Sequence, residues 1–323
     1  MPHLLEVKDL TTVFAGDYGT NISVDHISFC VEQGEVVCIV GESGCGKSVT
    51  SLSIMGLLGK GGAVIDGSVF FDGKNLLAMS EKELDQVRGD ELTMIFQDPL
   101  TSLNPVFTVG SQITESIRTH MHLSREEARK RAVMLLTQVG MPGAEEVMKK
   151  YPHTLSGGMR QRVMIAMALS CNPRLLIADE PTTALDVTIQ AQIMKLLKEL
   201  QQEKNMSMIL ITHDIGLVAN TADRVIVMYA GQIIEEAPAE ELFAAPKHPY
   251  TQALLATVPT IRDEADRQLQ AIPGMVPESY DDIPGCRFAD RCPYRRKECD
   301  MPQEAYEFGK GHKARCVVAK QEI

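Results

Sequence analysis

The pattern of apolar and polar residues predicts a chain of alternating strands and helices. An uninterrupted apolar, β-branched run at 36–40 is typical of a buried strand, and a Gly-rich loop and a helix over about 47–58 follow it. Strands that alternate with helices favour a mainly parallel sheet covered by helices. The other predicted strands are 69–71, 93–96, 175–178 and 208–211, and the other predicted helices are about 157–170 and 187–203.

Three stretches depart from this alternation. Residues before 39 are predicted to form short strands with turns. Residues 106–150 have a helical pattern that includes the charged run REEARKR at 125–131, which predicts a helical subdomain with a solvated face. After about residue 238, proline becomes frequent and the periodicity fades. The predicted domains are therefore 1–240, with a helical subdomain over about 100–170, and a loop-rich accessory domain at 241–323.

Composition narrows the choice of partners. The net charge is −11 and there is no long basic stripe, so nucleic acid is disfavoured as a partner. The N-terminus lacks the layout of a signal peptide, and no uncharged apolar run reaches the roughly 18–20 residues that span a bilayer. We expect a soluble, cytoplasmic chain, which leaves docking onto a membrane protein open.

The segment Gly41–Ser48, GESGCGKS, matches the phosphate-loop pattern G-x-x-x-x-G-K-[ST] between a predicted strand and a predicted helix. Glycines let the backbone turn its N–H groups around phosphates, the lysine adds positive charge, and the serine hydroxyl binds Mg²⁺. The following helix directs its positive end at the anion. The sequence therefore predicts a Mg-ATP site formed by Gly41, Ser43, Gly44, Cys45, Gly46, Lys47, Ser48 and Val49, with the Cys45 thiol outside the chemistry.

Two acidic residues end a second apolar strand. Asp179 and Glu180 follow the run LLIA at 175–178, and ligands of α/β sheets bind at such strand ends. Asp179 is predicted to hold Mg²⁺, and Glu180 to act as the general base on the attacking water.

The segment Leu155–Met159, LSGGM, followed by RQR, resembles the signature of the ATP-binding-cassette ATPases. The resemblance implies that Ser156 and Gly158 meet the γ-phosphate bound on a second ATPase subunit, so that each subunit holds half of two composite sites. It implies an α/β P-loop fold with an antiparallel β part, a helical signature subdomain and a small C-terminal accessory domain.

Other residues match this family in order. Gln97 resembles the glutamine that contacts Mg²⁺ and water, Asp186 the interface segment, and His213 the histidine that contacts the γ-phosphate. The catalytic set that the resemblance implies is thus Glu180, His213, Gln97 and Lys47, with Ser48, Gln97 and Asp179 around Mg²⁺. Tyr18 stands where the family places an aromatic ring on adenine, and Phe14 is its competitor.

Several longer segments resemble the branch that serves dipeptide and oligopeptide importers. They are QDP at 97–99, TSLNP at 101–105, YPH at 151–153, ADEPTTALDVTIQAQ at 178–192 and HPYT at 248–251. ATPases of nickel and glutathione importers have similar motifs, so the cargo stays open. The resemblance implies a peripheral subunit on the cytoplasmic face of the membrane, paired with a second, non-identical ATPase, two transmembrane permease subunits and an extracytoplasmic solute-binding protein.

Four of the eight cysteines gather near the C-terminus, at Cys286, Cys292, Cys299 and Cys316. In a reducing compartment, clustered cysteines are more often metal ligands than disulfides. Zinc sites usually contain short C-x₂₋₄-C pairs, which this spacing lacks, so a [4Fe–4S] cluster is favoured over zinc, free thiols or a disulfide. The peptide-importer branch has a similar cysteine set, where it implies an iron–sulfur cluster.

Two rival functions follow from the same motifs. A cassette ATPase that acts on DNA or ribosomes usually has two cassettes or a long coiled-coil insertion, and neither is apparent in this sequence. A binding module with a decayed active site would have lost some of Lys47, Asp179, Glu180 and His213, yet all four are present.

Overall fold

The computed structural model describes residues 3–16, 19–98, 102–183, 185–257, 272–277 and 279–322. The chain forms two compact units. Unit 1 comprises residues 1–31, 36–77 and 212–323, and unit 2 comprises residues 32–35 and 78–211. No helix within the described ranges is both long and apolar enough to cross a membrane.

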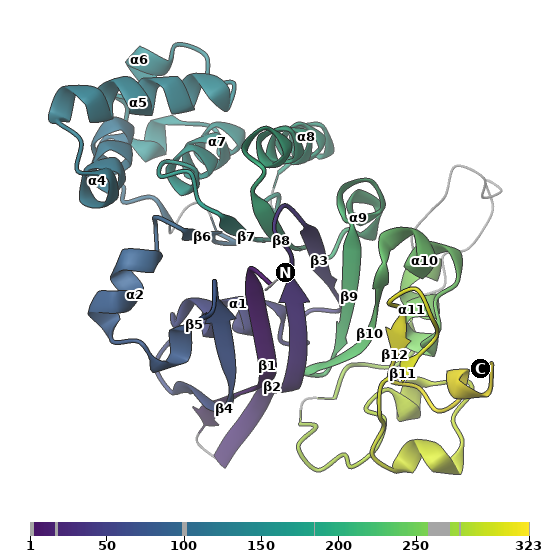
Figure 1. Ribbon diagram of the computed structural model, residues 1–323. Helices are drawn as coiled ribbons and strands as arrows, with labels where there is room; N and C mark the ends of the chain where they lie inside the picture. Colours follow the sequence, from purple (N-terminus) through teal and green to yellow (C-terminus); the bar gives the residue numbers. More distant parts are fainter. Residues whose placement is uncertain are drawn as a thin grey trace. The chain divides into compact units, whose positions relative to one another are not determined.

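Unit 1 contains an antiparallel sheet and a group of strands around β3 (Figure 1). The antiparallel sheet has the order β2-β1-β4-β5. β3 pairs in parallel with β9, and β10, β12 and β11 follow in antiparallel pairing. All five residues of β3 are buried, as expected for a strand covered on both faces. The strands are β1 (Leu5–Gly16), β2 (Gly19–Val31), β3 (Val36–Val40), β4 (Gly62–Phe71), β5 (Lys74–Asn75), β9 (Arg224–Tyr229), β10 (Gln232–Pro238), β11 (Tyr306–Glu307) and β12 (Lys313–Ala314).

The prediction of short strands before residue 39 was wrong. β1 and β2 contain 12 and 13 residues and pair with each other. Register shifts between Val7 and Val13 interrupt the two-residue alternation from which a long strand is predicted. Asp9 adds to this irregularity with a positive φ of 45°. Similarly, β4 begins at Gly62, seven residues before the predicted start at 69. The prediction missed this part of the strand because Gly62 and Gly67 interrupt the apolar pattern.

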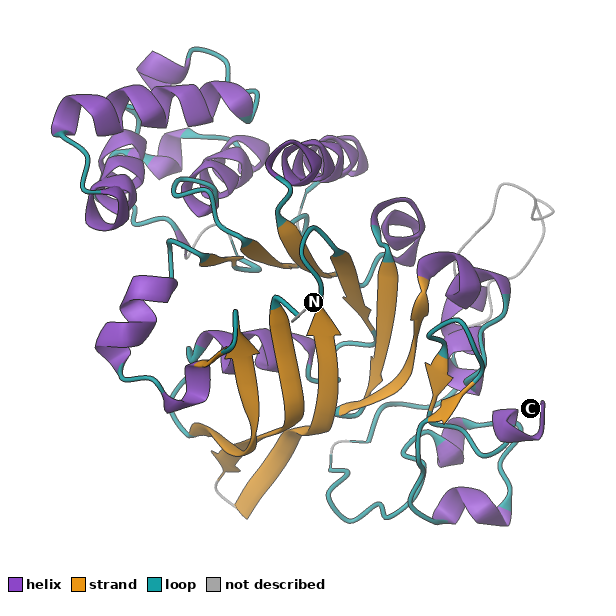
Figure 2. Ribbon diagram, viewed as in Figure 1, coloured by secondary structure: helices purple, strands orange, loops and turns teal. Residues whose placement is uncertain are grey.

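Unit 2 contains three parallel strands and most of the long helices. β7 (Leu175–Asp179) pairs with β6 (Leu92–Ile95) and with β8 (Ser207–Ile211). The predicted helical stretch at 106–150 is confirmed, and it contains the helices α4, α5 and α6 (Figure 2). Helix α7, which follows this stretch, packs against α4 and α5, and these two also pack against each other. The helices are α2 (Glu81–Val87), α4 (Val109–Met121), α5 (Arg125–Gln138), α6 (Ala144–Val147), α7 (Gly157–Ala168) and α8 (Val187–Lys204).

Helix α5 shows why the charged run is solvated. Its buried residues, Ala128, Ala132, Leu135 and Leu136, are spaced to lie on one face of a helix. Ser124 and Glu127 form a capping box at its start, which satisfies two backbone donors. The charged side chains between 125 and 131 are exposed or half-buried, as the sequence predicted.

The Pro-rich C-terminal part of unit 1 is loop-rich, as predicted (Figure 2). Its β12 adds to the sheet edge at β10, where Glu235 pairs with Ala314. The helices of unit 1 are α1 (Lys47–Met55), α9 (Ile215–Thr221), α10 (Ala239–Ala244) and α11 (Pro249–Ala256), with short 3₁₀ turns at Ala289–Arg291, Lys297–Asp300 and Ala319–Glu322.

Candidate functional site

The phosphate loop connects β3 to α1 in unit 1. Gly41, Gly44 and Gly46 have φ values of 153°, 80° and 100°, a region that favours glycine. A Cβ atom at Gly41 would lie 2.2 Å from the carbonyl oxygen of Met228, and one at Gly46 would lie 2.5 Å from that of Ser23. Both positions therefore require glycine for space as well as for conformation.

Lys47 is held inside this loop. Its Nζ donates to the carbonyl oxygens of Gly41 and Glu42, at 2.9 and 3.0 Å, and the residue is only 6% exposed. Helix α1 begins at Lys47, and its N-cap Gly46 has no side chain to bind the first backbone N–H groups. Ser48 and Val49 are half-buried in this first turn. A buried ammonium beside uncapped N–H groups suits a phosphate anion.

Cys45 is fully buried in the loop. Burial raises the pKa of its thiol, and Lys47 opposes this shift. A neutral, buried thiol is a poor nucleophile, so its setting agrees with a packing role.

The two strand-end carboxylates belong to unit 2. Asp179 is the last residue of β7 and is 4% exposed. Glu180 follows with a φ of 46°, which is unusual for a residue other than glycine. Gln97 Nε2 and Thr183 Oγ1 each donate to the same oxygen of Glu180, both at 2.8 Å. Gln97 and Glu180 thus lie together, whereas the contribution of Thr183 was not predicted from the sequence.

The signature segment starts α7. Ser156 is the N-cap of α7, and its hydroxyl accepts a hydrogen bond from the N–H of Met159 at 3.3 Å. A Cβ atom at Gly158 would lie 2.9 Å from a methyl group of Ile189, so this glycine permits a close approach of α7 and α8. Asp186 caps α8 by accepting from the N–H of Ile189 at 3.0 Å. Ser156 and Asp186 therefore also stabilise helix ends.

The remaining predicted residues are the histidine expected at the γ-phosphate and the two aromatic candidates for adenine. His213 is exposed between β8 and α9. Tyr18 lies outside the described residues, so its stacking on adenine stays a prediction. Its competitor Phe14 is half-buried on β1, with its ring next to Gly62.

The four C-terminal cysteines are free thiols of unit 1, and Cys286 lies near enough to the other three for their charges to act on it. Burial raises the pKa of Cys286 to about 12, and the other three thiols add to this shift. The backbone N–H of Cys286 donates to the carbonyl oxygen of Cys299 at 2.8 Å. Cys299 and Cys316 are buried, while Cys286 and Cys292 are half-buried.

Backbone N–H groups point at each of these sulfur atoms. The N–H of Arg296 donates to Cys299 Sγ at 3.4 Å. Backbone hydrogen bonds also oppose the burial-driven rise in the pKa of Cys286, Cys292 and Cys316. Such donors stabilise thiolates that ligate a metal centre.

The spacing of the thiols bears on which metal they suit. Within the part of the chain that the structure describes, no three of these sulfur atoms lie within 4.8 Å of one another. Four thiolates around one zinc ion, at about 2.3 Å each, would lie about 3.8 Å apart. The four thiols therefore do not form a tetrahedral zinc site as they stand.

Two family profiles match the chain. The profile described as ABC transporter matches residues 24–183, and the profile described as the C-terminal region of oligopeptide/dipeptide transporters matches residues 234–299. The second match includes Cys286, Cys292 and Cys299 and ends before Cys316.

Relatives match over nearly the whole chain. The oligopeptide transport ATP-binding protein AppD of Bacillus subtilis (strain 168) is 53% identical over 324 residues, which cover 100% of this chain and 98% of the relative. The dipeptide transport ATP-binding protein DppD of Escherichia coli (strain K12) is 52% identical over 314 residues, 97% of this chain and 96% of the relative.

Solved structures match the fold. A dimeric ATP-binding cassette, MJ0796, in a post-hydrolysis state bound to ADP and Pi, has a TM-score of 0.66 at 30% identity, covering 73% of this chain and 98% of that one. The protein cbiO1 from Clostridium perfringens, part of the ABC transporter complex cbiONQ, has a TM-score of 0.64 at 33% identity, covering 76% of this chain and 92% of that one. By its sequence and its α/β fold with an antiparallel β part and a helical subdomain, the chain belongs to the ABC transporter family, as an ATP-hydrolysing subunit with the C-terminal region of oligopeptide/dipeptide transporters.

Proposed function

We propose that this chain powers the uptake of dipeptides or oligopeptides through an ABC importer. The observation that carries the proposal is the phosphate loop. There the Lys47 ammonium is bound by the carbonyls of Gly41 and Glu42, next to the N-terminus of α1, which has no side-chain cap. The peptide class rests on the match of residues 234–299 and on relatives named for dipeptide and oligopeptide transport. Nickel or glutathione is the alternative cargo for the same motor.

In this proposal, the residues that resemble the family motifs act on Mg-ATP. Lys47 neutralises the β- and γ-phosphates, and Glu180 is the general base that activates water. His213 contacts the γ-phosphate. The Mg²⁺ ligands are Ser48, Gln97 and Asp179. Ser156, Gly158 and Asp186 serve the nucleotide bound to the partner ATPase.

The hydrogen bonds of Glu180 suggest how hydrolysis is restrained. Gln97 and Thr183 occupy one carboxylate oxygen of Glu180 in the structure. A general base must instead lie within hydrogen-bond reach of the attacking water. With Mg-ATP bound, Gln97 would serve as a ligand of Mg²⁺ in place of its contact with Glu180, and that carboxylate oxygen would then be available to accept from the attacking water.

The partners in this proposal are a second, non-identical ATPase, two transmembrane permease subunits and an extracytoplasmic solute-binding protein, with the chain on the cytoplasmic face of the membrane. A permease would dock on the exposed apolar surface formed by Val106, Phe107 and Tyr151, which are 71%, 53% and 42% exposed. The N–H of Val109 donates to the carbonyl of Lys150 at 2.9 Å, which holds these two segments side by side.

We also propose that Cys286, Cys292, Cys299 and Cys316 hold a [4Fe–4S] cluster. Their number and the backbone N–H donors at their sulfur atoms support a metal–thiolate centre, and their spacing along the sequence, which lacks short C-x₂₋₄-C pairs, favours the cluster over zinc. Such a cluster would join the turns of a region that has few regular elements. Anaerobic purification should yield a brown protein with about four irons per chain, whereas a colourless protein with one zinc would refute the assignment.

Transport assays test the function itself. Cells that lack this chain should lose uptake of a labelled dipeptide or oligopeptide, and Lys47→Ala should fail to restore it because nucleotide binding is weakened. Uptake of nickel and glutathione is measured in the same cells. If these cells lose nickel or glutathione uptake but keep peptide uptake, the chain powers import of that other cargo and not of peptides.

A further inference from the structure

Glu42, the second residue of the phosphate loop, links the nucleotide site to the C-terminal region. Its backbone carbonyl accepts from Lys47 Nζ at 3.0 Å. Its backbone N–H donates to the hydroxyl of Tyr250 in α11 at 2.9 Å. Its carboxylate accepts from both terminal nitrogens of Arg291, at 2.7 and 3.0 Å. Two of the three partners thus come from the C-terminal region, and the third is the phosphate-binding lysine.

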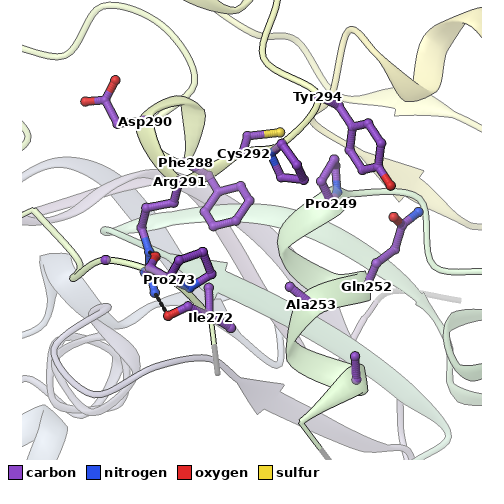
Figure 3. A pocket seen from close by; sticks show the side chains of 13 residues that line it. Pro249, Gln252, Ala253, Ile272, Pro273, Phe288, Asp290, Arg291, Cys292 and Tyr294 are labelled. Atoms are coloured by element: carbon purple, nitrogen blue, oxygen red, sulfur yellow. Dashed lines mark hydrogen bonds between the residues drawn. The ribbon is translucent and has the colours of Figure 1, made fainter. Parts of the chain in front are cut away.

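Arg291 is rigidly mounted for this contact. Its side chain is only 6% exposed, against 28% for Glu42. Its Nη1 also donates to the hydroxyl of Tyr229 at 3.2 Å, and its Nε donates to the carbonyl of Pro273 at 2.8 Å. The guanidinium carbon lies 5.8 Å from the ring centre of Phe288, and Figure 3 shows Arg291 beside Phe288 and Pro273 at the edge of a pocket of about 660 Å³. A buried guanidinium with two-pronged pairing holds its carboxylate in one geometry.

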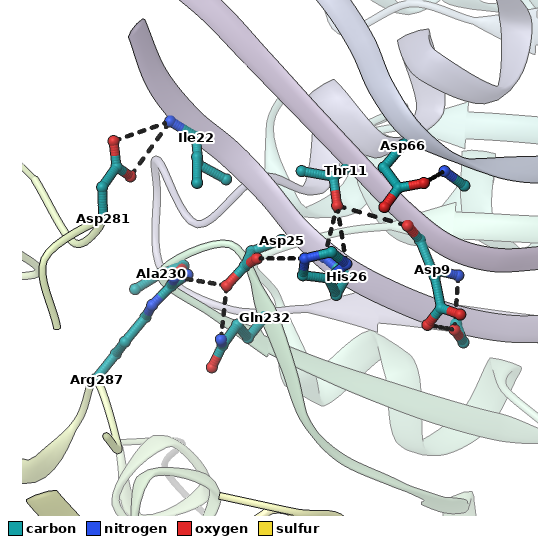
Figure 4. Close-up of polar contacts among 12 residues, drawn as sticks. Asp9, Thr11, Ile22, Asp25, His26, Asp66, Ala230, Gln232, Asp281 and Arg287 are labelled. Carbon is teal, nitrogen blue, oxygen red and sulfur yellow. Dashed lines mark hydrogen bonds and ion pairs between the residues drawn. The ribbon is translucent and has the colours of Figure 1, made fainter. Parts of the chain in front are cut away.

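A second set of contacts joins the same region to β2 and to the residue after β9 (Figure 4). Arg287 donates to the carboxylate of Asp25 at 2.6 Å, and it also donates to the carbonyl of Ala230. The carboxylate of Asp281 accepts from the N–H of Ile22 at 3.3 Å. Asp25 and Ile22 lie on β2, on either side of Ser23, whose carbonyl faces Gly46. The C-terminal region therefore contacts the loop itself through Glu42, and it contacts the neighbouring strand β2 through a second set of polar contacts.

We propose that Arg291, together with Tyr250, is a positioning residue for nucleotide binding. Arg291 and Tyr250 fix Glu42, and Glu42 in turn fixes one of the two carbonyls that hold Lys47. Arg291 also neutralises the Glu42 carboxylate, which would otherwise oppose the charge of a phosphate bound on the same loop. Without this contact, the loop can adopt conformations that do not bind ATP. The observed affinity for ATP then falls in proportion to the fraction of molecules whose loop is in the binding conformation.

This inference rests on the proposed ATP site, and it assigns the C-terminal region a direct part in nucleotide affinity. The coupling between the C-terminal region and the nucleotide site is local, because it depends on the Arg291–Glu42 ion pair and on the hydrogen bond between Glu42 and Tyr250. Its size should fall near the low end of coupling between two sites, about tenfold in affinity.

The test compares matched variants of the full chain with a fluorescent ATP analogue. Arg291→Gln should raise the Kd about tenfold, and in the complex with the partner ATPase it should leave kcat at saturating ATP nearly unchanged. Tyr250→Phe, which removes one hydrogen bond, should raise the Kd roughly threefold. The control is Arg295→Gln, because Arg295 lies in the same region and pairs with Asp290 and Asp300 but with no residue of the phosphate loop; its Kd should match that of the wild type.

A double variant separates positioning from a general loss of structure. In a Glu42→Gln background, Arg291→Gln should change the Kd by less than about twofold, because its partner is already altered. An additive effect in this background, or a wild-type Kd in Arg291→Gln, would overturn the proposal. If Arg291→Gln does not fold, Tyr250→Phe tests the proposal in its place, and an unchanged Kd for ATP in Tyr250→Phe would also overturn the proposal. Failure of the wild type to bind ATP, with Lys47→Ala no weaker, would instead refute the proposed nucleotide site.

Discussion

Replacing the buried Glu235 by glutamine should destabilise the C-terminal region strongly. Glu235 lies on β10 and its side chain is fully buried. Its Oε1 accepts from the N–H of Lys247 at 2.6 Å and from Nε2 of His312 at 2.7 Å, and its Oε2 accepts from the N–H of His248 at 2.8 Å. One carboxylate therefore joins three segments of the chain.

The magnitude follows from counting donors. A glutamine side chain has one oxygen, so its amide nitrogen must face a donor that Glu235 now satisfies. One buried donor without a partner costs about 1–3 kcal/mol, and the remaining hydrogen bonds lose about 1 kcal/mol each because their acceptor is no longer charged. Relief of the desolvation of the carboxylate offsets part of this loss. We expect a net destabilisation of about 3 kcal/mol.

Urea unfolding and amide hydrogen exchange measure this effect. The amides of Lys247 and His248 should exchange much faster in Glu235→Gln, because each donates to the altered group. The matched control is Glu241→Gln, which weakens a solvent-accessible pair with Lys310 near the same segment and should cause little change. If Glu235→Gln unfolds at the wild-type urea concentration and both amides stay protected, the reasoning from the buried carboxylate is wrong.

Three further variants test the motor. Glu180→Gln should reduce ATP hydrolysis by at least roughly 10²-fold while ATP binding persists, because it removes a general base; an unchanged turnover number would contradict that role. Gly41→Ala should lower both ATP affinity and the melting temperature, since its Cβ would lie 2.2 Å from the carbonyl of Met228, and a variant that binds ATP normally would show that the loop adapts. Phe107→Asp should keep the ATP affinity of the isolated subunit but impair peptide uptake and binding to permease-containing vesicles, whereas normal uptake would exclude this surface from docking.

The sequence predicted those strands whose pattern is uninterrupted. β3, β7 and β8 are each five consecutive buried residues, and their predicted bounds agree with the structure to within one residue. The paired β1 and β2 were missed as long strands because register shifts mix the two faces of the strand. Their length depends on cross-strand pairing, which a local pattern does not contain.

The same distinction holds for the site. The phosphate loop is a contiguous motif, so its residues and their glycine conformations could be predicted from the sequence. The pairing of Glu42 with Arg291 joins residues 249 positions apart, and neither residue belongs to a motif that specifies the contact. Thr183 was likewise missed, because its hydrogen bond to Glu180 depends on the turn after β7.

The short strand β12 has a consequence for any shortened form of this protein. It covers the outer edge of β10 through the pairs Glu235–Ala314 and Glu236–Lys313. A cassette that ends after β10 would expose that edge, with its unpaired backbone donors and acceptors, to other copies of itself. Such a fragment should aggregate by strand addition even with an intact phosphate loop, so this two-residue strand protects the solubility of the enzyme.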